Sequence, residues 1–155
     1  MRPQIVLIAS LLALPAAGCE SQACTLIGCV GTFAVFLERA AWTAGEYTVT
    51  VVADDETIAC TATLPLQCDA PPACPEASQL TLGVEGCKLP PAQHKLGNLE
   101  FRQGKAPKSV SVQVHQDDVL LGEGTYTPDY SESQPNGPDC GPICVGAEGV
   151  TLTLK

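Results

Sequence analysis

The chain has 155 residues and a formal net charge of −9 at neutral pH, because 17 acidic side chains outnumber eight basic ones. Hydrophobic residues make up 45% of the chain and charged residues 16%. This balance is typical of a single globular domain and excludes a disordered polyelectrolyte. We expect no nucleic-acid partner, because the chain has no excess of lysine and arginine to replace the counterions of phosphates.

The first 18 residues are organised like an export signal. Arg2 is followed by an apolar run over residues 5–14 and then by the small residues Ala16, Ala17 and Gly18. The apolar run is too short to span a bilayer. We therefore assign residues 1–18 to targeting and exclude them from the fold.

The stretch Leu14-Pro15-Ala16-Ala17-Gly18-Cys19 resembles the lipobox of bacterial lipoproteins, with Ala16 where that family most often has Leu. The resemblance implies cleavage before Cys19 and a covalent lipid on Cys19, with no other cofactor. Residues 19–30 would then form the attachment site and a short tether, and residues 31–155 a single domain. Glu20 is not the Asp that favours the inner membrane in enteric bacteria, so the resemblance implies a lipid-anchored envelope protein of the outer membrane.

The cysteine count agrees with a lipid on Cys19. Nine cysteines are an odd number, and an unpaired cysteine in an exported protein requires an explanation. Without Cys19 an even set remains that can form four disulfides: Cys24, Cys29, Cys60, Cys68, Cys74, Cys87, Cys140 and Cys144.

Pairing between cysteines close in sequence is the simplest interpretation, although about 105 connectivities are possible. It joins Cys24 to Cys29, Cys68 to Cys74 and Cys140 to Cys144, and leaves Cys60 for Cys87. The last pair requires a bulge at Gly86, because Cys87 has the opposite parity to the apolar residues Leu80, Leu82 and Val84.

Short runs of alternating apolar and polar residues predict strands. Tyr47, Val49, Val51 and Ala53 share one face, Asp54-Asp55-Glu56 forms a turn, and Ile58, Cys60, Ala62 and Leu64 share a face of the next strand. Cys60 is therefore expected to be buried. The expected strands cover 32–38, 47–53, 57–66, 79–85, 96–102, 110–115, 119–121, 125–130 and 149–154.

Strand spacing of about eight to twelve residues predicts an all-β fold. We expect an antiparallel sandwich of immunoglobulin or fibronectin type III character stapled by disulfides, with a Greek-key β-barrel as the alternative. Few aromatic residues are present, so disulfides would compensate for a core of smaller side chains. Trp42 and Tyr47 are expected to pack in the core and at its edge rather than to form a sugar-stacking platform.

The C-terminal part, with Pro135-Asn136-Gly137-Pro138 and Cys140-Gly141-Pro142-Ile143-Cys144, looks like a recurring ending of small cysteine-containing lipoproteins of predatory soil bacteria such as myxobacteria. In that group these turns precede a closing strand, which here is 149–154. The resemblance covers about a quarter of the chain and implies a fold and a location, but no activity.

Candidate catalytic and metal-binding residues are few. Cys140 and Cys144 are separated by one residue more than a thioredoxin-like dithiol, with no helix to activate a thiol, which favours a structural disulfide. His94 and His115 lack the spacing of metal ligands and are interpreted as surface residues, and a small envelope hydrolase using either one is the alternative function. The acidic clusters 54–56 and 116–118 offer oxygen ligands to calcium, but both fall at turns, and we expect no metal site.

Basic residues are concentrated in one segment, in which Lys88, Lys95, Arg102, Lys105 and Lys108 are accompanied by one acid, Glu100. Such a segment indicates either an interaction patch or an edge strand protected by lysines. The sequence as a whole predicts a non-catalytic lipoprotein that acts as a binding or structural module. Its expected partners are the membrane, through the lipid, and an unknown protein or polysaccharide.

Overall fold

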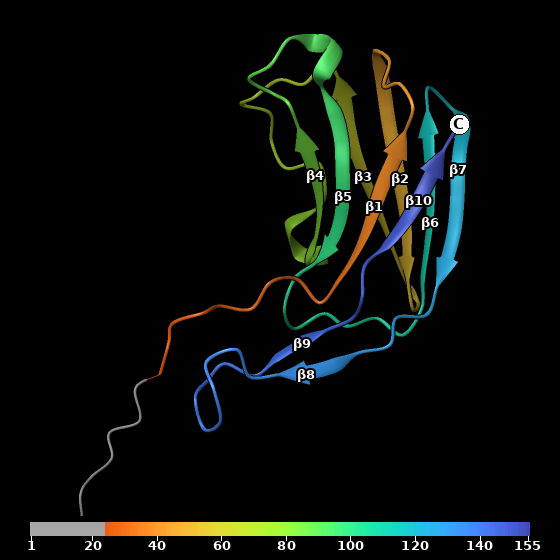
Figure 1. Ribbon diagram of the computed structural model, residues 1–155. Coiled ribbons are helices and arrows are strands. Elements are labelled where there is room, and N and C mark those ends of the chain that lie inside the picture. The colour runs from red at the N-terminus through yellow and green to blue at the C-terminus, as the bar shows by residue number, and fades with distance from the viewer. Residues whose placement is uncertain (1–23) are drawn as a thin grey trace, which may run out of the picture.

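The computed structural model describes residues 24–155 as two four-stranded sheets with a small two-stranded sheet beneath them (Figure 1). The first sheet contains, in spatial order, β10 (Val150–Leu154), β1 (Phe33–Arg39), β5 (Lys95–Phe101) and β4 (Leu80–Glu85). The second contains β3 (Glu56–Leu64), β2 (Gly45–Ala53), β6 (Val110–Gln116) and β7 (Val119–Tyr126). The small sheet pairs β8 (Ser131–Ser133) with β9 (Cys144–Gly146), and single 3-10 turns form η1 (Glu76–Ser78) and η2 (Pro91–Gln93). The predicted all-β sandwich is confirmed.

The strand order is that of an immunoglobulin-like sandwich. Strands β1 to β7 occupy the positions of strands B, C, C′, D, E, F and G, because β1 pairs with β5, β5 with β4, β2 with β3 and β6, and β6 with β7. The place of strand A is taken by the last strand, β10, which pairs with β1 in parallel from Val35↔Val150 to Arg39↔Leu154. That pair departs from the expected antiparallel arrangement. The two separate sheets correspond to the sandwich and not to the alternative closed barrel.

The core follows the predicted alternation of apolar residues. In β2 the side chains of Tyr47, Val49 and Val51 are completely buried, and the buried faces of β6 and β5 lie among the same cluster. Cys60 of β3 is also completely buried, as expected. Each buried Val, Leu or Phe contributes about 1.5–3 kcal/mol relative to an exposed one, so these strands are held mainly by aliphatic packing.

Two predicted strands are partly merged. Strand β7 joins the predicted strand 119–121 to the first two residues of the predicted strand 125–130 and runs through Gly122 and Gly124, whereas residues 127–130 have no strand structure. A Cβ on Gly122 would lie 2.8 Å from Leu154 Cδ2, so this glycine permits the close approach of β10. The glycine therefore marks a packing contact rather than a strand break. Strands β8 and β9 were not predicted.

The eight cysteines of the described residues form four disulfides, as the even set predicted, but the expected pairing is wrong. The bonds join Cys24 to Cys140, Cys29 to Cys144, Cys60 to Cys74 and Cys68 to Cys87. The physical reason is that segments distant in sequence lie side by side. The chain near Cys74 runs along the edge of β3, where Thr61 N–H donates to Ala73 O at 2.9 Å, so Cys60 has Cys74 beside it. Cys87 follows Gly86, which has a φ of 85°, and bonds outside the core to Cys68.

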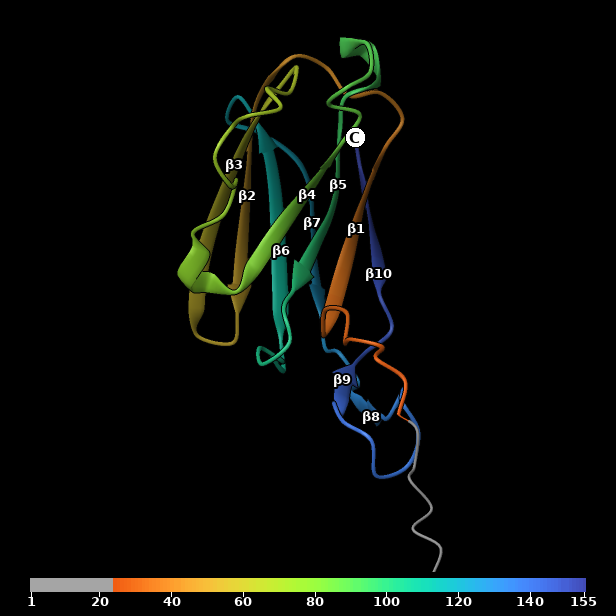
Figure 2. The same cartoon turned by 90° about the vertical axis from the view of Figure 1, so that its left-hand side faces the viewer.

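Both views show the segment before β1 and the β8–β9 sheet at the same end of the sandwich (Figures 1 and 2). We call this the tether end, defined by residues 24–32 and 131–146. The opposite end contains the end of β1 at Arg39 and the beginning of β5 at Lys95, together with the C-terminus.

Candidate functional site

At the tether end, covalent bonds attach the segment before β1 to the rest of the domain. Cys24 and Cys29 are bonded to Cys140 and Cys144, which lie 116 and 115 residues further along the chain. Residues 24–30 have no regular secondary structure. The two disulfides therefore attach an irregular segment to the domain at two neighbouring points.

Asn136 adds a polar clamp between the same two segments. Its Oδ1 accepts hydrogen bonds from Thr25 Oγ1 and Ile27 N, both at 2.7 Å. Its Nδ2 donates to Ile27 O at 2.9 Å and to Gly141 O at 2.8 Å. The amide therefore uses two acceptor and two donor positions, which is its full capacity. The sequence indicated only a turn at this residue, because nothing local marks a side chain that bonds more than 100 residues away.

The chain between this clamp and β1 is also bonded to the domain. Gly31 N donates to Glu100 Oε1 at 3.0 Å, and Gln103 Nε2 donates to Val30 O at 2.6 Å. The buried Thr32 donates from its backbone N to Phe101 O at 2.7 Å. The predicted tether, residues 19–30, is thus described only from Cys24 onward, and that part is attached to the domain.

The structure does not gather the five basic residues predicted as a patch. Lys88 and Lys95 lie near the start of β5, while Arg102, Lys105 and Lys108 follow its end. A seven-residue separation along a strand corresponds to about 23 Å, so the two groups are at opposite ends of the sandwich. Lys95 forms an ion pair with Glu85 at 2.9 Å and Lys105 forms one with Glu56. The predicted single patch is therefore replaced by two separate groups.

The histidines differ in environment. His94 was expected at the surface but is only 5% exposed, since its ring bridges two loops. Its Nδ1 accepts from Leu66 N at 2.8 Å, which leaves the proton on Nε2 for donation to Leu89 O at 2.9 Å. His115 is half-buried in β6. Neither histidine is hydrogen-bonded to a carboxylate within residues 24–155, so the geometry gives no support to the alternative hydrolase.

The acidic clusters lie in turns, where two of their carboxylates accept hydrogen bonds from backbone N–H groups. Asp54 Oδ1 accepts from Lys108 N at 2.9 Å and from Ser109 N at 3.0 Å, and Asp117 Oδ1 accepts from Glu46 N at 2.9 Å. Asp54, Asp117 and Asp118 have positive φ values, a conformation that Asp tolerates better than most residues. In the described part of the chain no group of three or more His, Cys, Asp or Glu side chains is arranged to hold a metal ion.

At the end opposite the tether, β1 and β5 separate. Their ladder ends where Phe36 pairs with Asn98, although β1 continues to Arg39 and β5 starts three residues earlier, at Lys95. Beyond the ladder, β1 remains paired with β10 and β5 with β4. We call the gap between residues 37–39 and 95–97 the fork. It opens into a shallow, solvent-open cavity of about 350 Å³, whose lining residues Glu38, Lys95 and Thr153 are exposed. The volume is within the range of about 300–1,000 Å³ that is usual for small-molecule sites.

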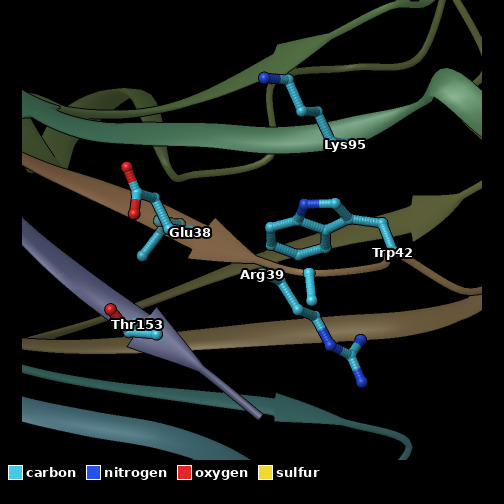
Figure 3. A pocket seen from close by; sticks show the side chains of 7 residues that line it. Glu38, Arg39, Trp42, Lys95 and Thr153 are labelled. Atoms are coloured by element: carbon cyan, nitrogen blue, oxygen red, sulfur yellow. The ribbon is translucent and has the colours of Figure 1, made fainter.

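The side chains around the fork come from three strands and one loop. Figure 3 shows the indole of Trp42, from the loop between β1 and β2, beside Lys95 of β5, with Glu38, Arg39 and Thr153 on the other side. The sequence did not predict this cavity, because Thr153 and Lys95 are 58 residues apart (153 minus 95) and no motif connects them.

A hydrogen-bonded cluster fixes the inner wall of the fork. Arg39 Nη1 donates to Tyr47 Oη and to Gln116 Oε1, both at 2.8 Å, and Arg39 Nε donates to Lys155 O at 2.7 Å. The ring centroids of Trp42 and Tyr47 are 5.4 Å apart, and the Arg39 guanidinium carbon lies 6.0 Å from the Trp42 centroid. Tyr47 is fully buried, and Trp42 is half-buried and packs against the core, so both contact the core as expected, while part of the Trp42 side chain remains exposed at the fork.

Comparisons with known proteins identify no relative. The chain matches no family model, no curated protein and no solved structure.

Proposed function

We propose that the protein is a non-catalytic cell-envelope lipoprotein, a binding or structural module held at the membrane by lipid on Cys19. The observation that carries the proposal is the pairing of all eight cysteines from Cys24 onward with one another. None of these eight remains to pair with Cys19 within the chain. An acylated Cys19 accounts for the ninth cysteine and agrees with the lipobox-like stretch before it.

The tether end supports this proposal geometrically. Cys24 is five residues after Cys19, and a chain extends by at most about 3.3–3.6 Å per residue, so the lipid would lie within about 18 Å of the first disulfide. The Cys24 and Cys29 disulfides and the Asn136 clamp then transmit the position of the anchor to the sandwich. This arrangement favours a module whose tether end faces the membrane.

Lipid is the form of attachment that fits the rest of the chain. Among the described residues no helix is long and apolar enough to cross a membrane. Each buried methylene contributes about 0.8 kcal/mol, so two or three acyl chains hold a protein far more firmly than one. Glu20 after the lipid site favours the outer membrane as the location.

The decisive experiment is the mass of the mature chain purified from a bacterial host with its own lipoprotein pathway. We expect a chain that begins at Cys19, carries the mass of its acyl chains on that residue and partitions into detergent. Cys19→Ser should partition into the aqueous phase, while the neighbouring control Ser21→Ala should behave like the parent. An unmodified Cys19, or a Cys19 bonded to another sulfur, would contradict the proposal.

A further inference from the structure

We propose that the fork is a binding site for a neutral saccharide. A sugar ring would stack on the indole of Trp42, and its hydroxyl groups would exchange hydrogen bonds with Glu38, Lys95 and Thr153. The inference goes beyond the proposed function and does not depend on the lipid. It rests on the backbone gap, the chemistry of its lining and the balance of charge around it.

The backbone gap creates the space. A strand inside a sheet is normally hydrogen-bonded to a neighbour on both sides. Beyond Phe36↔Asn98, however, β1 and β5 are not paired with each other. On their outer sides both ends are paired, Arg39 with β10 and Lys95 with β4. The fork is therefore a cavity between two supported strands, and it does not need to open before a ligand enters.

The lining supplies both donors and acceptors. The Glu38 carboxylate and the Thr153 hydroxyl make no hydrogen bond or ion pair with any described residue, and both line the cavity. Lys95 is paired with Glu85, but the two side chains are 49% and 54% exposed, and an exposed pair contributes only about 0–1 kcal/mol. Lys95 can therefore turn to a ligand at little cost.

Trp42 supplies an aromatic surface of fixed orientation. The ring is held against Tyr47, beside Arg39 and against the core, and the half-buried Trp42 side chain also lines the cavity. Its indole N–H has no hydrogen-bond acceptor among residues 24–155. An apolar ring face with one unused donor suits a ligand that has both C–H faces and hydroxyl groups.

The charges select a neutral ligand over an ionic one. An anion would be repelled by the carboxylates of Glu38 and Glu85 and by the net charge of −9. A cation would be repelled by the ammonium group of Lys95. The Arg39 guanidinium already uses three of its five N–H donors, two on Nη1 and one on Nε, to hold Tyr47, Gln116 and the Lys155 carbonyl, so it is fixed in the wall and can offer an anion only Nη2. A saccharide uses the carboxylate as an acceptor and the ammonium as a donor without a net charge of its own.

The position of the fork agrees with such a role. It lies at the end of the sandwich opposite residues 24–32 and 131–146 (Figure 1). If the tether end faces the membrane, the fork faces away from it, toward the glycans of the envelope. This orientation concerns access alone, since the cavity is the same in the unlipidated chain.

The single tryptophan of the chain gives a direct measurement, because all tryptophan fluorescence comes from Trp42. The oxidised, unlipidated chain would be titrated with tetra-N-acetylchitotetraose, cellohexaose and maltohexaose, and with polygalacturonate as the charged comparison. We expect a saturable fluorescence change with at least one neutral oligosaccharide. In parallel NMR titrations the indole N–H resonance of Trp42 should shift with the same midpoint.

Two conservative variants test the site without disturbing the core. Glu38→Gln replaces a charged acceptor by a neutral amide and Thr153→Val removes the hydroxyl, so each should weaken binding by about fivefold to tenfold, the worth of about one hydrogen bond. The matched controls Glu132→Gln on β8 and Thr151→Val on β10 lie outside the cavity and should bind like the parent. Circular dichroism would show that all four variants are folded.

Three results would overturn the inference. The first is the absence of a saturable response of the parent to all three neutral oligosaccharides up to their solubility limits. The second is binding that Glu38→Gln and Thr153→Val leave unchanged. The third is a response to polygalacturonate alone, which would make the fork an anion site. None of these results bears on Cys19, so the lipoprotein proposal would stand or fall separately.

Discussion

The side chain of Asn136 holds the backbone of Ile27 by both of its polar groups, accepting from Ile27 N at 2.7 Å and donating to Ile27 O at 2.9 Å. The side-chain amide thus bonds both the N–H and the C=O of one residue, as a neighbouring strand does in a β-sheet. Asn136 is 8% exposed, whereas Ile27 is exposed. The clamp therefore fixes an exposed segment from a buried residue.

Replacing Asn136 by Ala should destabilise the domain by about 2 kcal/mol, because four hydrogen bonds are lost but water reaches the exposed partners. Chemical denaturation measures this change. Hydrogen exchange should show that the Ile27 amide loses protection while amides of β2 and β6 keep theirs. Asn136→Asp is a second disruptive variant, since its carboxylate cannot donate to Ile27 O and Gly141 O, and it should also lose protection at Ile27. Unchanged protection of the Ile27 amide in Asn136→Ala would contradict this account.

The disulfide pairing predicts which thiol each single cysteine variant releases. Cys24→Ser should leave Cys140 free, and Cys29→Ser should leave Cys144 free. Alkylation of the unreduced protein followed by peptide mass mapping identifies the released thiol. Labelling of Cys29 in Cys24→Ser would instead show pairing between neighbours in sequence.

The two long-range disulfides should not contribute equally when removed in turn. While one remains, the loop of more than 100 residues stays closed, and loss of the other opens only a ring of about ten residues, at a cost of about 2–3 kcal/mol. Loss of the second should cost about 4–5 kcal/mol more. Denaturation of the paired Cys→Ser variants, alone and combined, measures both steps, and equal steps would show that the loop-entropy account fails here.

The strands were predictable because their signal is local, whereas the sites depend on contacts between distant residues. Alternation of Tyr47, Val49 and Val51 with polar residues is sufficient to place β2 and its buried face. The basic segment looked continuous because Lys95 and Arg102 are close in sequence, but β5 carries them to opposite ends. No local pattern distinguishes a turn asparagine from the Asn136 clamp, or relates Thr153 to Trp42 across the fork.

Stability at high pH should depend on Tyr130. Burial, together with the negative charge of Asp54, raises the pKa of this phenol to about 12, and its hydroxyl donates to Pro107 O at 3.0 Å. In the unfolded chain the pKa is about 10, so between pH 10 and 12 the unfolded state releases a proton that the folded state retains. The free energy of unfolding should therefore fall as the pH rises through this interval.

Tyr130→Phe removes the group that titrates, so its stability should decline less steeply between pH 10 and 12 than that of the parent. Denaturant midpoints measured at intervals of pH give both slopes. Tyr126 also has a raised pKa because of burial, and Tyr126→Phe serves as the comparison for a second phenol. Parallel slopes for the parent and Tyr130→Phe would show that Tyr130 is not responsible.

His94 should prove structural rather than catalytic. Its two ring nitrogens join Leu66 N and Leu89 O, so His94→Ala removes both bonds from a buried position and should cost about 2–4 kcal/mol. His94→Asn retains an acceptor near Nδ1, and His94→Gln places a donor near Nε2, so each should recover part of the loss. Denaturation of the three variants tests this order, and three equal losses would contradict separate roles for the two nitrogens. Saccharide binding at the fork should survive in every folded variant, because His94 does not line that cavity.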